Sequence, residues 1–70
     1  MNYNFPSVQR KIKTYIKTNE QNKTTVDAVD ICCYIGLRAD IVLTNLHALV
    51  NNGDIRHERH GLSSKYVTNL

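Results

Sequence analysis

The chain has 70 residues, 41% of them hydrophobic, and its 9 lysines and arginines against 6 aspartates and glutamates give a formal charge of +3. A chain of this length supports one small core, so we expect a single domain over residues 1–70. The adjacent cysteines Cys32 and Cys33 exclude a disulfide framework and do not fit zinc-ligand spacing. No apolar run approaches the roughly 20 residues of a membrane span, and no signal-type segment follows Met1. We therefore expect a cytoplasmic protein with no membrane partner.

The basic residues are concentrated towards the two ends of the sequence. Residues 1–23 contain five basic side chains and one acidic one, and residues 56–70 contain three and one. The segment 24–55 between them has one arginine and four aspartates. Two separate positive patches of this kind suit contacts with a phosphate backbone, although any single surface charge is more often only solvated.

A first helix is predicted over residues 6–18, where apolar side chains recur at helical spacing and Pro6 suits the first turn. The residues that share its apolar face are Val8, Ile12, Tyr15 and Ile16. The following stretch, "TNEQNK" at 18–23, has no apolar residue and is predicted to be a loop. The next three residues, "TTV", are short and rich in β-branched side chains, which predicts a short strand before the second helix.

The helical pattern resumes at Val26 and is expected to end at Gly36, which tolerates a left-handed C-cap. Asp27 and Asp30 lie near its start, where the helix dipole favours negative charge. Its apolar stripe comprises Ile31, Cys32, Ile35 and either Ala28 or Val29.

Leu37 is then expected to return to the core before a third helix over roughly 39–51, which Asn52 and Gly53 stop. The buried side of this third helix is expected to comprise Val42, Leu46, Leu49 and Val50. After Gly53, "DIRHE" and "SKYVT" have strand character and are separated by Gly61 and two serines, which predicts a hairpin over 55–67. Ile55 and either Tyr66 or Val67 should pack inward.

This order predicts an α+β fold of the winged helix-turn-helix type, with three helices and a C-terminal two-stranded wing. The short turn around Gly36 between the second and third helices is typical of the helix-turn-helix, and a small residue at Cys32 suits a close crossing of the two helices. The basic first helix and the wing distinguish this arrangement from an ordinary helical hairpin.

The stretches "SVQRKIKTYI", "ICCYIGLRADIVLTNLHALVNNGDI" and "HGLSSKYV" resemble the small regulators of bacterial fimbrial operons of the PapI and FaeA type, most closely the plasmid-encoded ones. The resemblance covers nearly the whole chain. It implies a transcriptional regulator of adhesin genes that binds double-stranded DNA and acts beside the leucine-responsive regulatory protein. In this family the helix that here begins at Arg38 is similar to a DNA-reading helix. This sequence departs from a strongly polar reader in having Ala39, Asp40 and Ile41 at the front of that helix.

The outer side of the third helix is the predicted base-reading surface, because its other side is apolar. Arg38 can contact guanine, Thr44 can donate or accept, and Ala39 or Leu43 can contact a thymine methyl group. Asp40 either accepts from cytosine or, as we favour, stabilises the helix start. Leu43 is alternatively a protein contact, and the sixth residue of this surface, His47, is alternatively only solvated.

The hairpin and the basic first helix are predicted to contact phosphates beside the groove, which position the protein without reading sequence. Its candidate residues are Arg56, His57, Arg59, His60 and Lys65. A metal site is disfavoured, because on a strand His57 and His60 do not lie on the same side. No cofactor or small-molecule substrate is expected, since the chain has no Gly-rich phosphate loop and little room for a substrate cleft. We therefore do not expect an enzyme. The alternative to DNA reading is a winged helix that binds a DNA-bound partner protein through Ile41 and Leu43.

Overall fold

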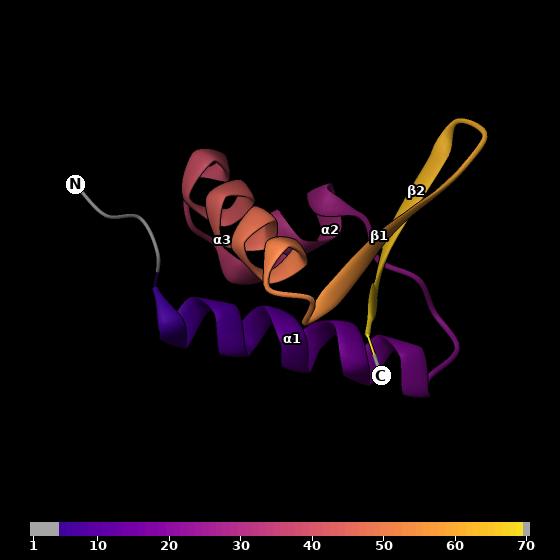
Figure 1. Ribbon diagram of the computed structural model, residues 1–70, viewed down its shortest axis with the longest axis horizontal. Helices are drawn as coiled ribbons and strands as arrows, with labels where there is room; N and C mark the ends of the chain where they lie inside the picture. Colours follow the sequence, from indigo (N-terminus) through magenta and orange to yellow (C-terminus); the bar gives the residue numbers. More distant parts are fainter. Residues whose placement is uncertain (1–4, 70) are drawn as a thin grey trace.

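The computed structural model describes the backbone of residues 5–69 and their side chains except those of His60 and Ser63. Three helices, α1 (Pro6–Gln21), α2 (Ala28–Ile35) and α3 (Ala39–Asn51), precede two strands, β1 (Ile55–His60) and β2 (Ser63–Thr68). The strands form an antiparallel hairpin that projects from the helices, as Figure 1 shows. The fold is therefore α+β and has the winged-helix arrangement that the sequence predicts.

Helix α1 extends three residues beyond its predicted end, so the prediction of a loop over 18–23 is wrong for residues 18–21. The Asn19 side chain donates to the Tyr15 carbonyl at 2.8 Å. The Glu20 carboxylate accepts from both the backbone N–H and the hydroxyl of Thr68. This contact joins the last turn of α1 to the end of β2, and a polar stretch therefore stays helical through tertiary contacts.

Helix α2 begins two residues after the predicted start, because Asp27 has extended backbone angles and caps the helix. The Asp30 N–H donates to the Asp27 carboxylate at 2.9 Å, and the Asp27 N–H donates to the Asp30 carboxylate at 3.2 Å. This capping box satisfies two N–H groups that lack helical partners. Of the two candidates for the apolar stripe, Ala28 packs against the core and Val29 is 67% exposed.

The turn between α2 and α3 contains one confirmed prediction and one error. Gly36 has the expected left-handed conformation, with φ of 76°. Leu37 does not return to the core and is 44% exposed. It lies in an irregular turn, where its apolar character does not determine which way it points, while Ile31 and Leu46 already fill the space between the helices.

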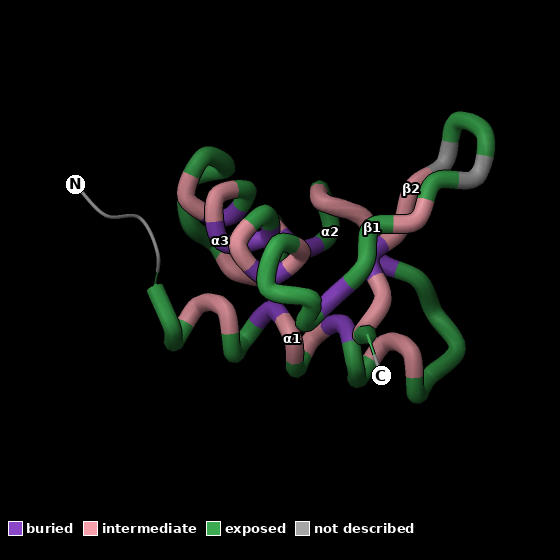
Figure 2. The backbone as a smooth tube through the Cα atoms, viewed as in Figure 1, coloured by how far each residue is buried: buried purple, intermediate pink, exposed green. Residues whose placement is uncertain are grey.

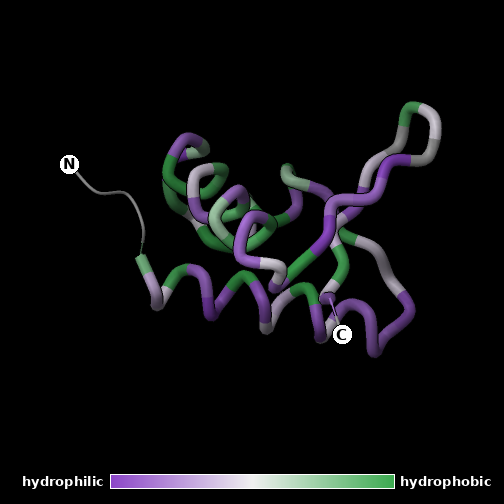
Figure 3. The backbone as a smooth tube through the Cα atoms, viewed as in Figure 1, coloured by the Kyte–Doolittle hydropathy of each residue, from purple (hydrophilic) through white to green (hydrophobic). Residues whose placement is uncertain are grey.

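The core lies where α1, α3 and the base of the hairpin meet (Figure 2). Figure 3 shows the apolar residues of α1 on the side that faces α3. The buried apolar residues are Ile12, Ile16, Val26, Ile31, Val42, Leu46, Leu49, Ile55 and Tyr66. Val8, Tyr15, Cys32, Ile35 and Val50 are only partly buried beside them. The predicted apolar faces of α1 and α3 are thus confirmed.

The hairpin is tighter than the sequence suggested. Its strands are joined through Gly61 and Leu62, and Gly61 has a φ of 64°, as the first central residue of a type II′ turn requires. The predicted strand before the second helix is present as a single bridge, in which the Tyr66 N–H donates to the Val26 carbonyl at 2.9 Å. Of the two inward candidates on β2, Tyr66 is buried and Val67 is half-buried.

Candidate nucleic-acid interface

The predicted reading surface of α3 lies on the outside of the molecule, because Val42, Leu46 and Leu49 turn the opposite side of the helix into the core. Five of its members are exposed and Thr44 is half-buried. The surface comprises Arg38, Ala39, Asp40, Leu43, Thr44 and His47. We call these six residues the α3 outer face.

At the start of this face, Arg38 and Asp40 form an ion pair with an N–O distance of 2.9 Å. Both side chains are well exposed, at 77% and 50%, so the pair adds little to stability. The other Asp40 oxygen accepts from the Ile41 N–H at 2.9 Å, within the first turn of α3. This contact agrees with the helix-start role that the sequence favoured for Asp40. The pair engages one terminal nitrogen of the Arg38 guanidinium, whose other N–H donors can still contact a base.

Thr44 also has a partner within the helix, since its hydroxyl donates to the Asp40 carbonyl at 2.8 Å. Its oxygen can still accept a hydrogen bond. Leu43, at 37% exposed, and Ala39 give this end of the face an apolar character. The polar groups that can read a base edge are therefore few.

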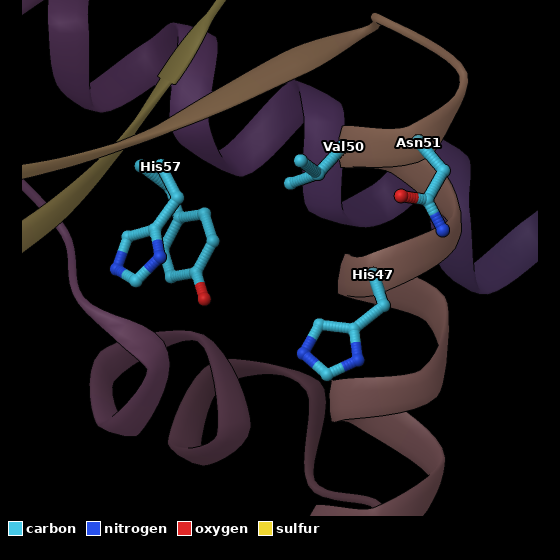
Figure 4. A pocket seen from close by; sticks show the side chains of 5 residues that line it. His47, Val50, Asn51 and His57 are labelled. Atoms are coloured by element: carbon cyan, nitrogen blue, oxygen red, sulfur yellow. The ribbon is translucent and has the colours of Figure 1, made fainter.

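A groove of about 260 Å³ separates the C-terminal half of α3 from the hairpin. His47, Val50 and Asn51 line it from α3, and His57 and Tyr66 line it from the hairpin. Figure 4 shows the side chains of His47 and His57 directed into this gap from its two sides. The structure thus brings one predicted residue of the reading helix and one of the hairpin to the same groove.

The ring of His57 is stacked on that of Tyr66, with centroids 4.4 Å apart and ring planes 8° from parallel. Burial raises the pKa of the Tyr66 hydroxyl, and the charge of Arg59 offsets part of this rise. The stack holds the His57 ring at the groove in a fixed orientation. The antiparallel register that follows from the two-residue turn places His57 directly opposite Tyr66.

The predicted phosphate contacts divide between the two faces of the hairpin, since side chains alternate along a strand. His57 and Arg59 share a face with the buried Ile55, whereas Arg56 and Lys65 lie on the other face. On that other face Glu58 lies 3.4 Å from Arg56 and 3.8 Å from Lys65. Its carboxylate lowers the positive potential there. The side chain of His60 is outside the described part of the structure.

The structure therefore brings His47 and His57 to one groove and places Arg59 on the same face of the hairpin as His57. Arg38 and Asp40 lie at the other end of α3. Sequence reasoning missed Asn51 as a groove residue and assigned Val50 and Tyr66 only to the core. It also missed Asn45, a fully buried polar residue of α3. A two-residue hairpin turn would have paired His57 with Tyr66, and the spacing of four residues from His47 would have placed Asn51 on the same side of the third helix.

Neither cysteine lines the groove. Both are free thiols; Cys32 is half-buried and Cys33 is exposed. Partial burial raises the pKa of the Cys32 thiol, and the neighbouring Cys33 raises it further. Among the side chains that the structure describes, no three histidine, cysteine or acidic groups are gathered as metal ligands would be.

No protein-family model matches the chain, and no curated protein or solved structure is significantly similar to it. None of the helices within residues 5–69 is both long enough and apolar enough to cross a bilayer.

Proposed function

We propose that the protein is a small transcriptional regulator that binds double-stranded DNA, with α3 in the major groove and the hairpin on flanking phosphates. Support comes from the exposed α3 outer face beside a hairpin that bears Arg56, Arg59 and Lys65. A helix presented in this way fits the width of the major groove, and cations beside it suit phosphate contacts.

The single observation behind the proposal is the groove shared by α3 and the hairpin. His47 and His57 are directed into it from opposite sides (Figure 4), and Arg59 lies on the same hairpin face as His57. Two successive elements, α3 and β1, thus present hydrogen-bonding groups to one ligand surface. A nucleic-acid backbone running between helix and wing would meet both.

The resemblance to fimbrial regulators extends the proposal to its biological setting. We infer that the targets are fimbrial adhesin genes, that the protein acts in the cytoplasm on the nucleoid, and that the leucine-responsive regulatory protein is its partner there. The paired state of Arg38 and the few polar groups on the α3 outer face support help from such a partner in base readout.

The proposal is tested by titrating labelled operator and unrelated duplexes at several salt concentrations. Four phosphate contacts predict that log K falls with log salt at a slope of roughly −4, about 0.9 per contact. Arg38→Ala should cost on the order of 1–3 kcal/mol on the specific site alone, whereas Arg59→Ala should weaken binding to all sequences about equally. Equal losses from both variants on every duplex would remove Arg38 from the reading role.

The second candidate is a winged helix that binds a DNA-bound protein without reading bases. Leu43, exposed on the α3 outer face beside the half-buried Ile41, favours this alternative. A salt response near zero, together with binding to DNA only when the partner protein is present, would select it over direct readout.

A further inference from the structure

A second hollow, of about 340 Å³, lies between α1 and the end of α2. Its lining residues are Ser7, Arg10, Lys11 and Thr14 of α1 and Tyr34 of α2. The spacings of three, one and three place the four α1 residues on one side of that helix. No lining residue comes from α3 or the hairpin, so this hollow is separate from the candidate nucleic-acid interface.

The hollow combines unpaired positive charge with an exposed aromatic ring. From Pro6 to Asn19 the chain has four cations and no acid, and Arg10 and Lys11 are both exposed. Neither joins an acidic group in an ion pair within the described residues. Tyr34 is 57% exposed, and its ring is stacked on that of Tyr15 with centroids 4.1 Å apart. The stack fixes the Tyr34 ring as a firm apolar surface beside the cations.

These features favour one class of occupant. Exposed cations around a fixed aromatic ring are complementary to carboxylates that flank an apolar side chain. The eight-residue helix α2 is only about 12 Å long, so a second copy of the chain would find little of the roughly 1,600 Å² that a stable dimer buries. A duplex seated on α3 and the hairpin would leave the Tyr34 ring uncovered. A short peptide segment matches the size of the hollow.

We propose that the hollow between α1 and α2 docks a short acidic segment of a partner protein. Its carboxylates contact Arg10 and Lys11, and an apolar side chain of the segment packs on the ring of Tyr34. This role does not depend on DNA binding, and it would leave the α3 outer face free.

The proposal is tested with a library of random twelve-residue peptides displayed on phage and selected against the intact chain. Enriched peptides should be acidic and contain an aromatic or large aliphatic residue. A synthetic, fluorescein-labelled enriched peptide is then titrated by anisotropy. The double variant Arg10→Glu and Lys11→Glu should bind it at least about tenfold more weakly. Lys17→Glu, a single charge reversal on the same helix outside the hollow, should alter affinity less than about twofold, because salt screens distant charges.

Amide chemical shifts separate the proposal from its rivals. The peptide should shift the amides of Arg10, Lys11 and Tyr34, and Arg38→Ala should leave its affinity unchanged. Enriched peptides without excess acid, or binding unaffected by the double variant, would overturn the proposal. So would duplex DNA that shifts the same amides and binds the double variant more weakly, or a dimer in sedimentation that the double variant abolishes. Tyr34→Ser removes the ring on which the apolar side chain of the peptide packs and should weaken peptide binding. If this variant does not fold, the charge variants alone test the proposal.

Discussion

Asn45 shows how one side chain organises the helices around the candidate interface. It is fully buried in α3, and its amide oxygen accepts from the Phe5 N–H at 2.9 Å and from the Gln9 side chain at 3.1 Å. Its amide nitrogen donates to the Ile41 carbonyl at 2.8 Å. One residue thus fixes the first turn of α1 against α3. The apolar pattern of α3 could not predict this, because the partners are 36 and 40 residues away.

Asn45→Ala should lower the free energy of unfolding by about 1–3 kcal/mol, because it removes these hydrogen bonds and leaves buried polar groups without their partner. Urea denaturation followed by circular dichroism measures the change. Asn51→Ala, at an exposed position of the same helix, is the matched control and should change stability by less than about 0.5 kcal/mol. Equal effects of the two changes would contradict a special role for Asn45.

At the start of α3, Arg38, the main candidate for contacting a base, is held in an ion pair with Asp40. Asp40→Asn should raise affinity for duplex DNA of any sequence by a few-fold, since it removes a negative charge near the phosphates and releases the guanidinium. Fluorescence anisotropy with a specific and an unrelated duplex measures this. Weaker binding to both duplexes would mean that the Asp40 carboxylate itself contacts the DNA or that it is needed to stabilise the first turn of α3.

At the scale of elements, helix ends were predicted best where the chemistry is local. Gly36 ends α2 as predicted, whereas the predicted start of α2 lies two residues too early, because a dipole role for Asp27 and Asp30 leaves out the capping box that they form. The last turn of α1 depends instead on Glu20, whose partner Thr68 is 48 residues away. The prediction that Leu37 is buried is wrong for a related reason, because an irregular turn has no periodicity from which burial can be inferred.

Asp27→Ala should destabilise the fold by about 0.5–2 kcal/mol, the usual cost of losing an N-cap side chain. Thermal unfolding measures the loss. Asp54→Ala makes the same charge change at an exposed position outside the helices and serves as the control. A loss at Asp54 as large as that at Asp27 would indicate a general charge effect in place of capping.

The contact between the end of the hairpin and the last turn of α1 can also be tested. Glu20→Ala removes the acceptor for the Thr68 N–H and hydroxyl, so the Thr68 amide should exchange with solvent at least about tenfold faster. Hydrogen exchange followed by NMR measures this rate residue by residue. The amides in the middle of α3 should keep their exchange rates relative to one another, and an unchanged Thr68 rate would show that the contact does not hold the strand.

For the whole molecule, the two raised pKa values predict a loss of stability at alkaline pH. Burial raises the pKa of Tyr66 above its ordinary value of 10.0, and burial together with Cys33 raises the pKa of Cys32 above 9.0. The folded state therefore holds these protons more tightly than the unfolded state, so stability is full below about pH 9 and declines as pH rises through these values. Urea midpoints at pH 8 and 10.5 test this, and Tyr66→Phe should reduce the decline. A midpoint that stays level or rises would contradict it.

The overall architecture follows from the sequence because the apolar faces of α1 and α3 and the turn at Gly36 are all local signals. The candidate site follows only in part. Alternation along β1 places His57 and Arg59 on one face and Arg56 on the other, so the residues predicted to contact phosphates do not share one surface of the hairpin. The groove itself depends on how far the hairpin stands from α3, a distance that no pattern in either segment encodes.

The base of the hairpin is held by the Val26 carbonyl, the Glu20 carboxylate, and the Asp54 and Gly53 carbonyls, which accept from Asn69 at 3.1 and 3.0 Å. These hydrogen bonds hold the hairpin at a fixed spacing from α3. In the proposed complex, the duplex would then have to adapt to this fixed spacing. Operators with flexible pyrimidine–purine steps at the uncontacted positions would then bind better than stiff ones with identical contacted bases.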